Sequence, residues 1–330
     1  MPFERAKSRN LKHFALALVL TILGGPVCAD QFPLRPITMI VPFVPGGPSD
    51  LVGRFAAMGM GPVLGQNVVV ENVTGGGGMA GGVRVANSPP DGYVIGLGTV
   101  GTLAQSQSLY KKPMYNPVTD FTPVALLANV PLVLVVRKDM PVSNLKEFIA
   151  YVRERQEQMQ YGSAGSAGQL GCVLVNYVIG LKVLHVPYRG SAPALQDLQA
   201  GRLDYMCDIM TTAKGPIDSG VVKPIAVLDS KRSPALPNVP TAEEQGTADL
   251  IAYTWNALFL PKNAPESVVT TLYAASRVAM RSQAVKERLV PLGAEIAADD
   301  KSGPQYLGEL IKSEIAKWAI PIRGAGVTVE

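Results

Sequence analysis

The chain has 330 residues, 47% of them hydrophobic and 17% charged, so it is long enough for two domains rather than one compact core. The first 29 residues hold four of the 30 basic and one of the 26 acidic residues, which leaves a nearly neutral remainder of 26 against 25. No block of Lys or Arg remains, which argues against nucleic acid or a membrane surface as a partner.

The N-terminal segment has the pattern of a secretory signal peptide. Basic residues are concentrated in residues 1–13, an apolar run covers residues 14–25, and small residues lead to Ala29. The apolar run is shorter than the ~20 residues that span a bilayer, so an uncleaved anchor is the weaker alternative. We expect cleavage after Ala29 and a periplasmic mature protein that begins at Asp30.

The first element expected after the signal peptide is a buried strand over residues 37–41. Pro45, Gly46 and Gly47 then force a turn, and a helical pattern begins at Leu51. A helix that starts there directs free N–H groups and the positive end of its dipole away from the helix. Such a helix start favours a carboxylate or phosphate without any charged side chain.

The rest of the chain alternates short apolar runs with helical patterns, which predicts an α/β protein with largely parallel sheets. Further strands are expected at residues 68–72, 94–99, 124–127, 132–136, 159–163, 183–186, 205–209, 224–228 and 256–260. Helices are expected at residues 51–59, 145–155, 169–179 and 192–200. Three helical stretches after residue 266 are expected to form a cap that closes back onto a sheet.

Glycine and small polar residues gather at the ends of four predicted strands, in residues 45–50, 74–78, 99–102 and 163–168. Each cluster taken alone could be a plain tight turn. Together they favour one shared site, because open α/β sheets bind ligands beyond the carboxyl ends of their strands. Main-chain N–H groups in glycine turns form anion-binding hollows, so a small carboxylate is the expected ligand and phosphate stays open.

The sequence offers little support for an enzyme. Residues 75–82 lack the Lys and Ser or Thr of a phosphate-binding loop, and neither Ser163 nor Ser166 has the flanking glycines of a nucleophile elbow. His185 is the one histidine after the signal peptide, and it is expected in the core or at a strand end. No metal cluster is expected. The alternative is a periplasmic hydrolase or lyase that uses Asp208 and Tyr188.

Cys172 and Cys207 are the two cysteines that remain after processing. In an oxidising compartment they could form a disulfide, although nothing in the sequence fixes their distance. The alternative is that both are small buried hydrophobic residues, one at a helix start and one in a strand.

Several motifs together resemble one family, the exported solute receptors of tripartite tricarboxylate transporters, also called Bug receptors. The motifs are Pro45-Gly-Gly-Pro-Ser-Asp50, Leu64-Gly-Gln-Asn-Val-Val-Val-Glu-Asn72, Pro90-Asp-Gly-Tyr93, Tyr161-Gly-Ser-Ala-Gly165, His185-Val-Pro-Tyr-Arg-Gly190, Gly201-Arg-Leu-Asp204 and Val239-Pro-Thr241. The resemblance implies an α/β, two-lobed periplasmic binding protein fold of type II with the ligand cleft between lobes. Residues 30–128 and 253–330 would form lobe one, and residues 129–252 lobe two.

The resemblance also implies a receptor without enzymatic activity or cofactor that holds a small organic carboxylate in the cleft. The residues carried over are, from lobe one, Phe43, Gly46, Gly47, Pro48, Ser49, Asp50, Gly76, Gly77, Thr99 and Gly101, and from lobe two Ser163, Ala164, Gly165, Ser166, Tyr188 and Asp208. Asp50 could instead stabilise the start of its own helix. Asp208 could accept a hydrogen bond from a ligand hydroxyl or amine, and Arg189 could pair with a second ligand carboxylate or face solvent.

The implied partners are a small organic anion and, transiently, the subunits of a membrane transporter or a sensor protein, with the receptor itself a monomer. One departure from the family pattern is the stretch of residues 171–175, Gly-Cys-Val-Leu-Val, where relatives commonly have His-Leu followed by an acidic residue. A tricarboxylate specificity is therefore not carried over to this chain.

Overall fold

The computed structural model describes residues 32–188 and 190–329. The expected signal peptide, its cleavage site and Arg189 lie outside the described residues. The strands are β1 (Ile37–Val41), β2 (Val68–Asn72), β3 (Val94–Thr99), β4 (Phe121–Arg137), β5 (Gln160–Ala164), β6 (Leu184–Tyr188), β7 (Tyr205–Ile209), β8 (Val222–Val227), β9 (Tyr253–Pro261) and β10 (Glu295–Ile296).

The α-helices are α2 (Pro48–Leu64), α3 (Met79–Ala86), α4 (Ser106–Leu109), α5 (Leu145–Arg155), α6 (Gly165–Ile179), α7 (Ser191–Gln199), α8 (Met210–Asp218), α9 (Glu266–Arg281), α10 (Gln283–Leu289) and α11 (Pro304–Gly324). Two short turns matter for the site, the 3₁₀ turn η1 (Gly76–Gly78) and the π-helical turn η2 (Gly101–Gln105). The α/β prediction is confirmed.

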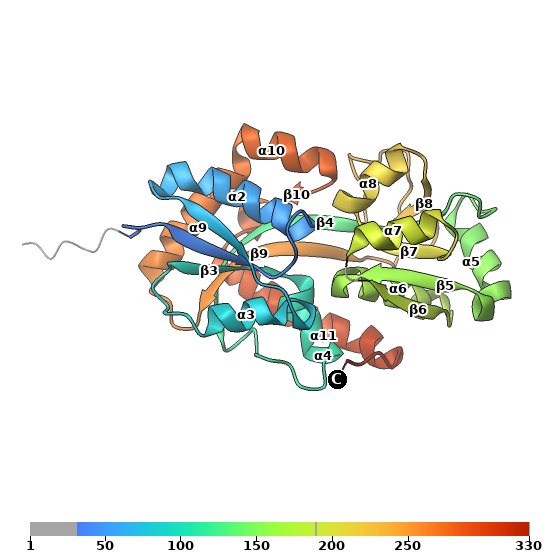
Figure 1. Ribbon diagram of the computed structural model, residues 1–330, viewed down its shortest axis with the longest axis horizontal. Coiled ribbons are helices and arrows are strands. Elements are labelled where there is room, and N and C mark those ends of the chain that lie inside the picture. Colours follow the sequence, from blue (N-terminus) through green and yellow to red (C-terminus); the bar gives the residue numbers. More distant parts are fainter. Residues whose placement is uncertain (1–31, 189, 330) are drawn as a thin grey trace, which may run out of the picture.

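Two groups of parallel strands are joined by a central antiparallel pair. The strand order is β2-β1-β3-β9-β4-β7-β5-β6, with β8 and β10 also paired to β4. β1 is parallel to β2 and β3, and β5 is parallel to β6 and β7, whereas β4 and β9 run antiparallel to their neighbours. The molecule has two lobes, and parallel strands of both lobes end toward the junction between them (Figure 1). Loops that follow these strands therefore face one another.

The prediction of two strands at residues 124–127 and 132–136 is wrong, because β4 is continuous over its 17 residues. Its first part pairs with β9 as far as Pro131, and its second part pairs with β7 from Leu132 onward. Proline has no N–H to donate, so Pro131 is tolerated where one ladder ends and the next begins. β4 thus passes from one lobe to the other, while lobe boundaries at residues 128 and 253 stay a prediction.

Two predicted helices begin earlier than expected. α2 starts at Pro48 instead of residue 51, because proline suits the first helical position, where its missing N–H is not needed. α2 also continues through Gly59, where a Cβ atom would lie 2.7 Å from the Cβ of Ala279 in α9. That close approach of two helices explains a glycine inside a helix. α6 starts at Gly165 instead of residue 169, so residues 165–168 of the predicted glycine loop are its first turn.

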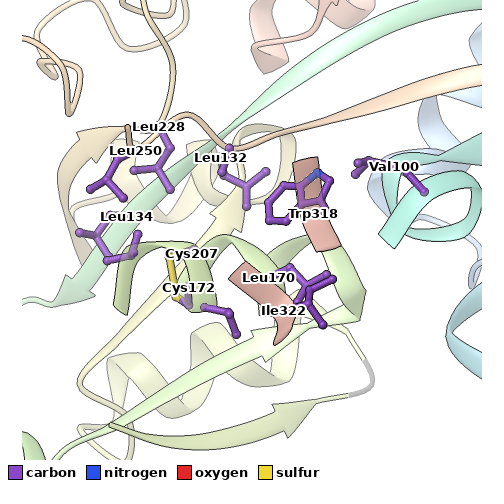
Figure 2. Packing of buried hydrophobic residues seen from close by; sticks show 14 of the residues in the cluster. Val100, Leu132, Leu134, Leu170, Cys172, Cys207, Leu228, Leu250, Trp318 and Ile322 are labelled. Carbon is purple, nitrogen blue, oxygen red and sulfur yellow. A yellow bond between two sulfur atoms is a disulfide. The ribbon is translucent and has the colours of Figure 1, made fainter. Parts of the chain in front are cut away.

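The helical tail packs back onto the sheet as expected, through α9 and α11 against β4. α11 also contacts α6 of the other lobe. At this contact the Trp318 side chain of α11 is 2% exposed and lies beside Leu132 of β4 and Leu170 of α6 (Figure 2). The Trp318 indole N–H donates to the buried carboxylate of Glu314 at 2.8 Å. A single apolar cluster therefore runs through the junction on this side of the sheet.

Candidate functional site

The β1–α2 loop is organised by the carboxylate of Asp50, which is only 1% exposed. This carboxylate accepts hydrogen bonds from the Gly46 N–H, the Asn72 amide and the Arg54 guanidinium, each at 2.8 Å. The Asn72 amide also donates to the carbonyl of Phe43 at 2.8 Å. Asp50 thus holds the turn in shape from within lobe one. Its donors belong to the turn before α2 and to the side chains of Arg54 and Asn72, and a direct contact with the ligand stays a prediction.

The pKa of Asp50 lies below its ordinary value of 3.8. Burial opposes the charged form, but the hydrogen bonds from Arg54, Gly46 and Asn72 outweigh that effect. The carboxylate is therefore ionised at neutral pH, and its negative charge is neutralised locally by the Arg54 guanidinium.

Asp50→Asn should lower the free energy of unfolding by about 2 kcal/mol at pH 7, because an amide cannot serve all three donors. The folded-state pKa is depressed, so this contribution is present above the unfolded-state pKa of about 3.9 and is lost as the pH falls below it. Urea unfolding measures the free energy of unfolding of both proteins at pH 7 and near pH 3. The difference between the unaltered protein and Asp50→Asn should be smaller near pH 3. The control is Asp218→Asn, which loses one exposed ion pair with Lys214 and should change stability by less than ~0.5 kcal/mol. Equal losses in both variants would contradict this role of Asp50.

The N–H groups at the start of α2 have no side-chain partner. Its N-terminal cap is Gly47, which offers no side-chain hydrogen bond, and Pro48 and Ser49 follow as the first helical residues. By contrast, α5 is capped by the Asn144 side chain, which accepts from the Glu147 N–H at 2.9 Å. An uncapped helix start leaves donors that an anion can satisfy.

In lobe one, Gly78 of η1 lies against both Phe43 and Thr102, and Gly101 lies beside Thr99. A Cβ atom at Gly78 would lie 3.1 Å from the Phe43 ring, so η1 packs directly on the β1–α2 loop. The neighbours of Gly76 and Gly77 are instead Met114 and Tyr110. A role for Gly76 and Gly77 in ligand binding stays a prediction.

The two lobes touch at Gly101 and Ser166. A Cβ atom at Gly101 would overlap the Ser166 hydroxyl and would lie 3.4 Å from the Ser166 Cβ and from the Thr99 Oγ1. The end of β3 in lobe one thus meets the first turn of α6 in lobe two. Residues separated by 65 positions in the sequence therefore lie in contact at the junction of the lobes.

The β5–α6 junction, like the β1–α2 loop, leads into a helix whose start has no side-chain cap. Ala164 is the N-terminal cap of α6 and makes no side-chain cap bond. Gly165 has a φ of +67°, a conformation that favours glycine, and a Cβ there would meet nothing within 4 Å. The first-turn N–H groups of α6 are therefore free of side-chain caps, as those of α2 are.

Asp208 ties together the starts of two further helices. It is 2% exposed and accepts from the hydroxyls of Ser191 in α7 and Thr212 in α8, each at 2.7 Å. Burial raises its pKa more than these hydrogen bonds lower it. The Tyr188 hydroxyl donates to Asp197 at 2.6 Å, and burial, together with Asp197, raises its pKa to about 12. The two residues of the enzyme alternative therefore serve separate structural contacts.

Three residues of the site were not singled out as site residues in the sequence. His185 bonds to Ser163, while Asn72 and Ser191 organise loops around Asp50 and Asp208. Asn72 and Ser191 could have been found from their positions, at a strand end and a helix start.

Within residues 32–188 and 190–329, no group of three His, Cys, Asp or Glu residues could hold a metal ion. None of the helices in those ranges has the length and apolarity needed to cross a membrane.

Comparison with known proteins decides the family. Residues 52–327 match the family described as tripartite tricarboxylate transporter family receptor. The chain belongs to this receptor family. BugT of Bordetella pertussis, one relative of this receptor, is 34% identical over 326 residues that cover 98% of the chain and 99% of BugT.

Two solved structures resemble the receptor closely. MatC from Rhodopseudomonas palustris, solved with bound malate, is 38% identical with a TM-score of 0.82, over 88% of the receptor and 100% of MatC. A second R. palustris protein, solved with adipate, is 34% identical with a TM-score of 0.83, over 90% of the receptor and 99% of that protein. These matches confirm the periplasmic binding protein fold.

Proposed function

We propose that this receptor binds a small organic carboxylate between its lobes in the periplasm and delivers it to a tripartite tricarboxylate-type membrane transporter. The observation that carries the proposal is the pair of uncapped helix starts, α2 in lobe one and α6 in lobe two, beside the contact between Gly101 and Ser166. Both helix starts present N–H donors and the positive end of a dipole. Malate in MatC and adipate in the second R. palustris protein support a dicarboxylate.

The proposed ligand contacts come from two short segments. In lobe one they are Gly46, Gly47, Pro48 and Ser49, and in lobe two Ala164, Gly165 and Ser166. Asp50 shapes the lobe-one segment through its bond to Gly46, and Asp208 ties together the neighbouring starts of α7 and α8. A ligand that touches both segments is bound completely only when the lobes are closed, so it shifts the population toward the closed form.

Export is part of the proposal, because a receptor of this kind meets its ligand outside the inner membrane. Cleavage after Ala29 would release the mature chain beginning at Asp30. Intact-mass measurement of protein recovered from the periplasm tests this directly, and a mass that includes residues 1–29 would contradict it.

A thermal-shift screen tests the binding function. At a concentration of ~100 times its dissociation constant, a ligand should add ~2.7 kcal/mol of native-state stability. For a protein of this size, that corresponds to a rise in Tm of roughly 4 °C. The screen should include mono-, di- and tricarboxylates, aromatic acids and nicotinate. Adipamide is the matched control for adipate, since it has the same length without the charges. If no carboxylate at millimolar concentration raises the Tm, the proposal is wrong.

A further inference from the structure

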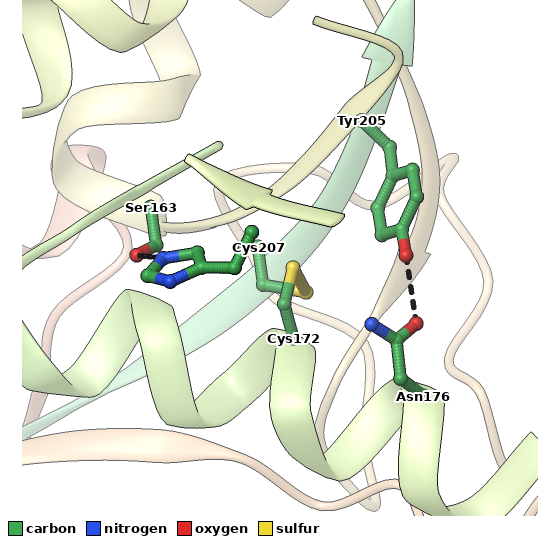
Figure 3. The surroundings of a disulfide bond; sticks show 6 residues. Ser163, Cys172, Asn176, Tyr205 and Cys207 are labelled. Atoms are coloured by element: carbon green, nitrogen blue, oxygen red, sulfur yellow. Dashed lines mark hydrogen bonds between the residues drawn. A yellow bond between two sulfur atoms is a disulfide. The ribbon is translucent and has the colours of Figure 1, made fainter. Parts of the chain in front are cut away.

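The Ser163 hydroxyl is used inside lobe two. Ser163 is the residue before the N-terminal cap of α6, it is 2% exposed, and its Oγ lies 2.7 Å from the Nε2 of His185 on β6 (Figure 3). Because α6 has no side-chain cap, this bond from the preceding strand is a side-chain contact that can fix where the helix starts. The junction that carries Gly165 therefore depends on the position of the His185 imidazole.

The imidazole is itself held by a column of rings. His185 stacks on Tyr161 with ring centroids 4.9 Å apart, and Tyr161 stacks on Tyr205 at 5.6 Å. The Tyr205 hydroxyl then donates to the Asn176 side chain of α6 at 2.7 Å (Figure 3). One end of the column is bonded to Ser163 of β5, and the other end is bonded to Asn176 of α6. The column fixes the imidazole plane relative to the anion-binding turn.

Burial lowers the pKa of His185, so its imidazole is neutral at pH 7. Tyr161 of β5 is the titratable group in contact with the ring, and Tyr205 of β7 follows one ring further. On α6, Cys172 is disulfide-bonded and Asn176 does not titrate. Among these neighbours none carries a charge at neutral pH. A carboxylate bound at the start of α6 would therefore add a negative charge near an imidazole whose named neighbours are all neutral.

We propose that His185 is a positioning residue of the carboxylate site, which holds the Ser163 hydroxyl under α6 and thereby keeps the main-chain N–H groups of the first turn aimed at the ligand. This inference rests on the proposed receptor function. It explains why a polar side chain occupies a half-buried position in an otherwise apolar strand. Its effect on affinity passes through Ser163 and not through direct contact with the ligand.

The test compares binding of malate and adipate to the mature chain and its variants by calorimetry. Ser163→Ala and His185→Phe, which keeps the stack on Tyr161, should each weaken binding about ten-fold. The double variant should be no weaker than either single variant, because both remove the same contact. Ser219→Ala is the matched control: it removes a serine hydroxyl that bonds the Gly215 carbonyl at the end of α8, so affinity should stay unchanged.

A second readout uses the single histidine of the mature chain, with any affinity tag removed. Titration of the imidazole followed by NMR should move to higher pH when carboxylate binds, because a nearby anion stabilises the imidazolium. Three outcomes would overturn the role of His185 and leave the proposed function standing. They are an unchanged titration of the imidazole, unaltered affinity in both single variants, and additive losses of affinity in the double variant. Failure of the unaltered protein to bind any carboxylate would overturn the proposed function and this inference with it.

Discussion

Replacement of Cys172 and Cys207 together by alanine should lower the free energy of unfolding by ~4 kcal/mol. The two cysteines form a disulfide with Cα atoms 5.3 Å apart, and it closes a loop of 35 residues. A cross-link of that length removes conformational entropy from the unfolded chain, which in the chain-entropy model corresponds to roughly 4 kcal/mol. The Tm should fall by roughly 6 °C for a protein of this size.

Calorimetry with and without a reductant provides the control. Both cysteines are fully buried, so the reductant acts on the unaltered protein as it unfolds. Its Tm should then fall to that of the double variant, whereas the Tm of the double variant should not respond. A reductant effect of equal size on both proteins would show that the disulfide does not account for the loss.

Gly101→Val should weaken carboxylate binding about 30-fold. A valine side chain at this position would overlap the Ser166 hydroxyl of the other lobe. Turning that hydroxyl away leaves no room for the two valine methyl groups, because the Ser166 Cβ is already at contact distance, 3.4 Å from the new Cβ. Overpacking of this kind costs about 2 kcal/mol, which is equivalent to that loss of affinity. Opening of the lobes relieves the overlap, so the Tm of the ligand-free variant should change little.

Gly215→Ala is the matched control for this variant. It lies in α8, where a new Cβ would meet nothing within 4 Å, so affinity should equal that of the unaltered protein. Small-angle scattering should show that saturating ligand compacts the unaltered protein and the Gly215→Ala variant more than the Gly101→Val variant. Wild-type affinity in Gly101→Val would mean that ligand binding does not require the contact between the lobes.

The elements predicted best are those whose signals lie within a few consecutive residues. The bounds of β1, β2, β3, β7 and α5 agree with the apolar runs and helical patterns in the sequence. The predictions failed where residues far apart in the sequence decide the bounds of an element. β4 continues through Pro131 because its neighbours change there, and α2 continues through Gly59 because Ala279 packs against it.

The candidate site divides in the same way. Its glycine turns were predictable from local backbone chemistry, whereas the starts of α2 and α6 were predicted three and four residues too late. The partners of its side chains were not, because Ser163 and His185 are 22 residues apart and meet only through the register of β5 and β6. The sequence left open whether the cysteines pair, and the fold of α6 onto β7 decides it.

The sequence by itself determined the export pattern, the α/β alternation, the resemblance to the receptor family and the glycine turns of two loops. Only the tertiary structure decided that Asp50 supports its loop, that Gly101 meets Ser166 and that His185 holds Ser163. The physical reason is that turn chemistry and helix starts are properties of neighbouring residues. Side-chain partners depend instead on strand register and helix packing, which bring together residues far apart in the chain.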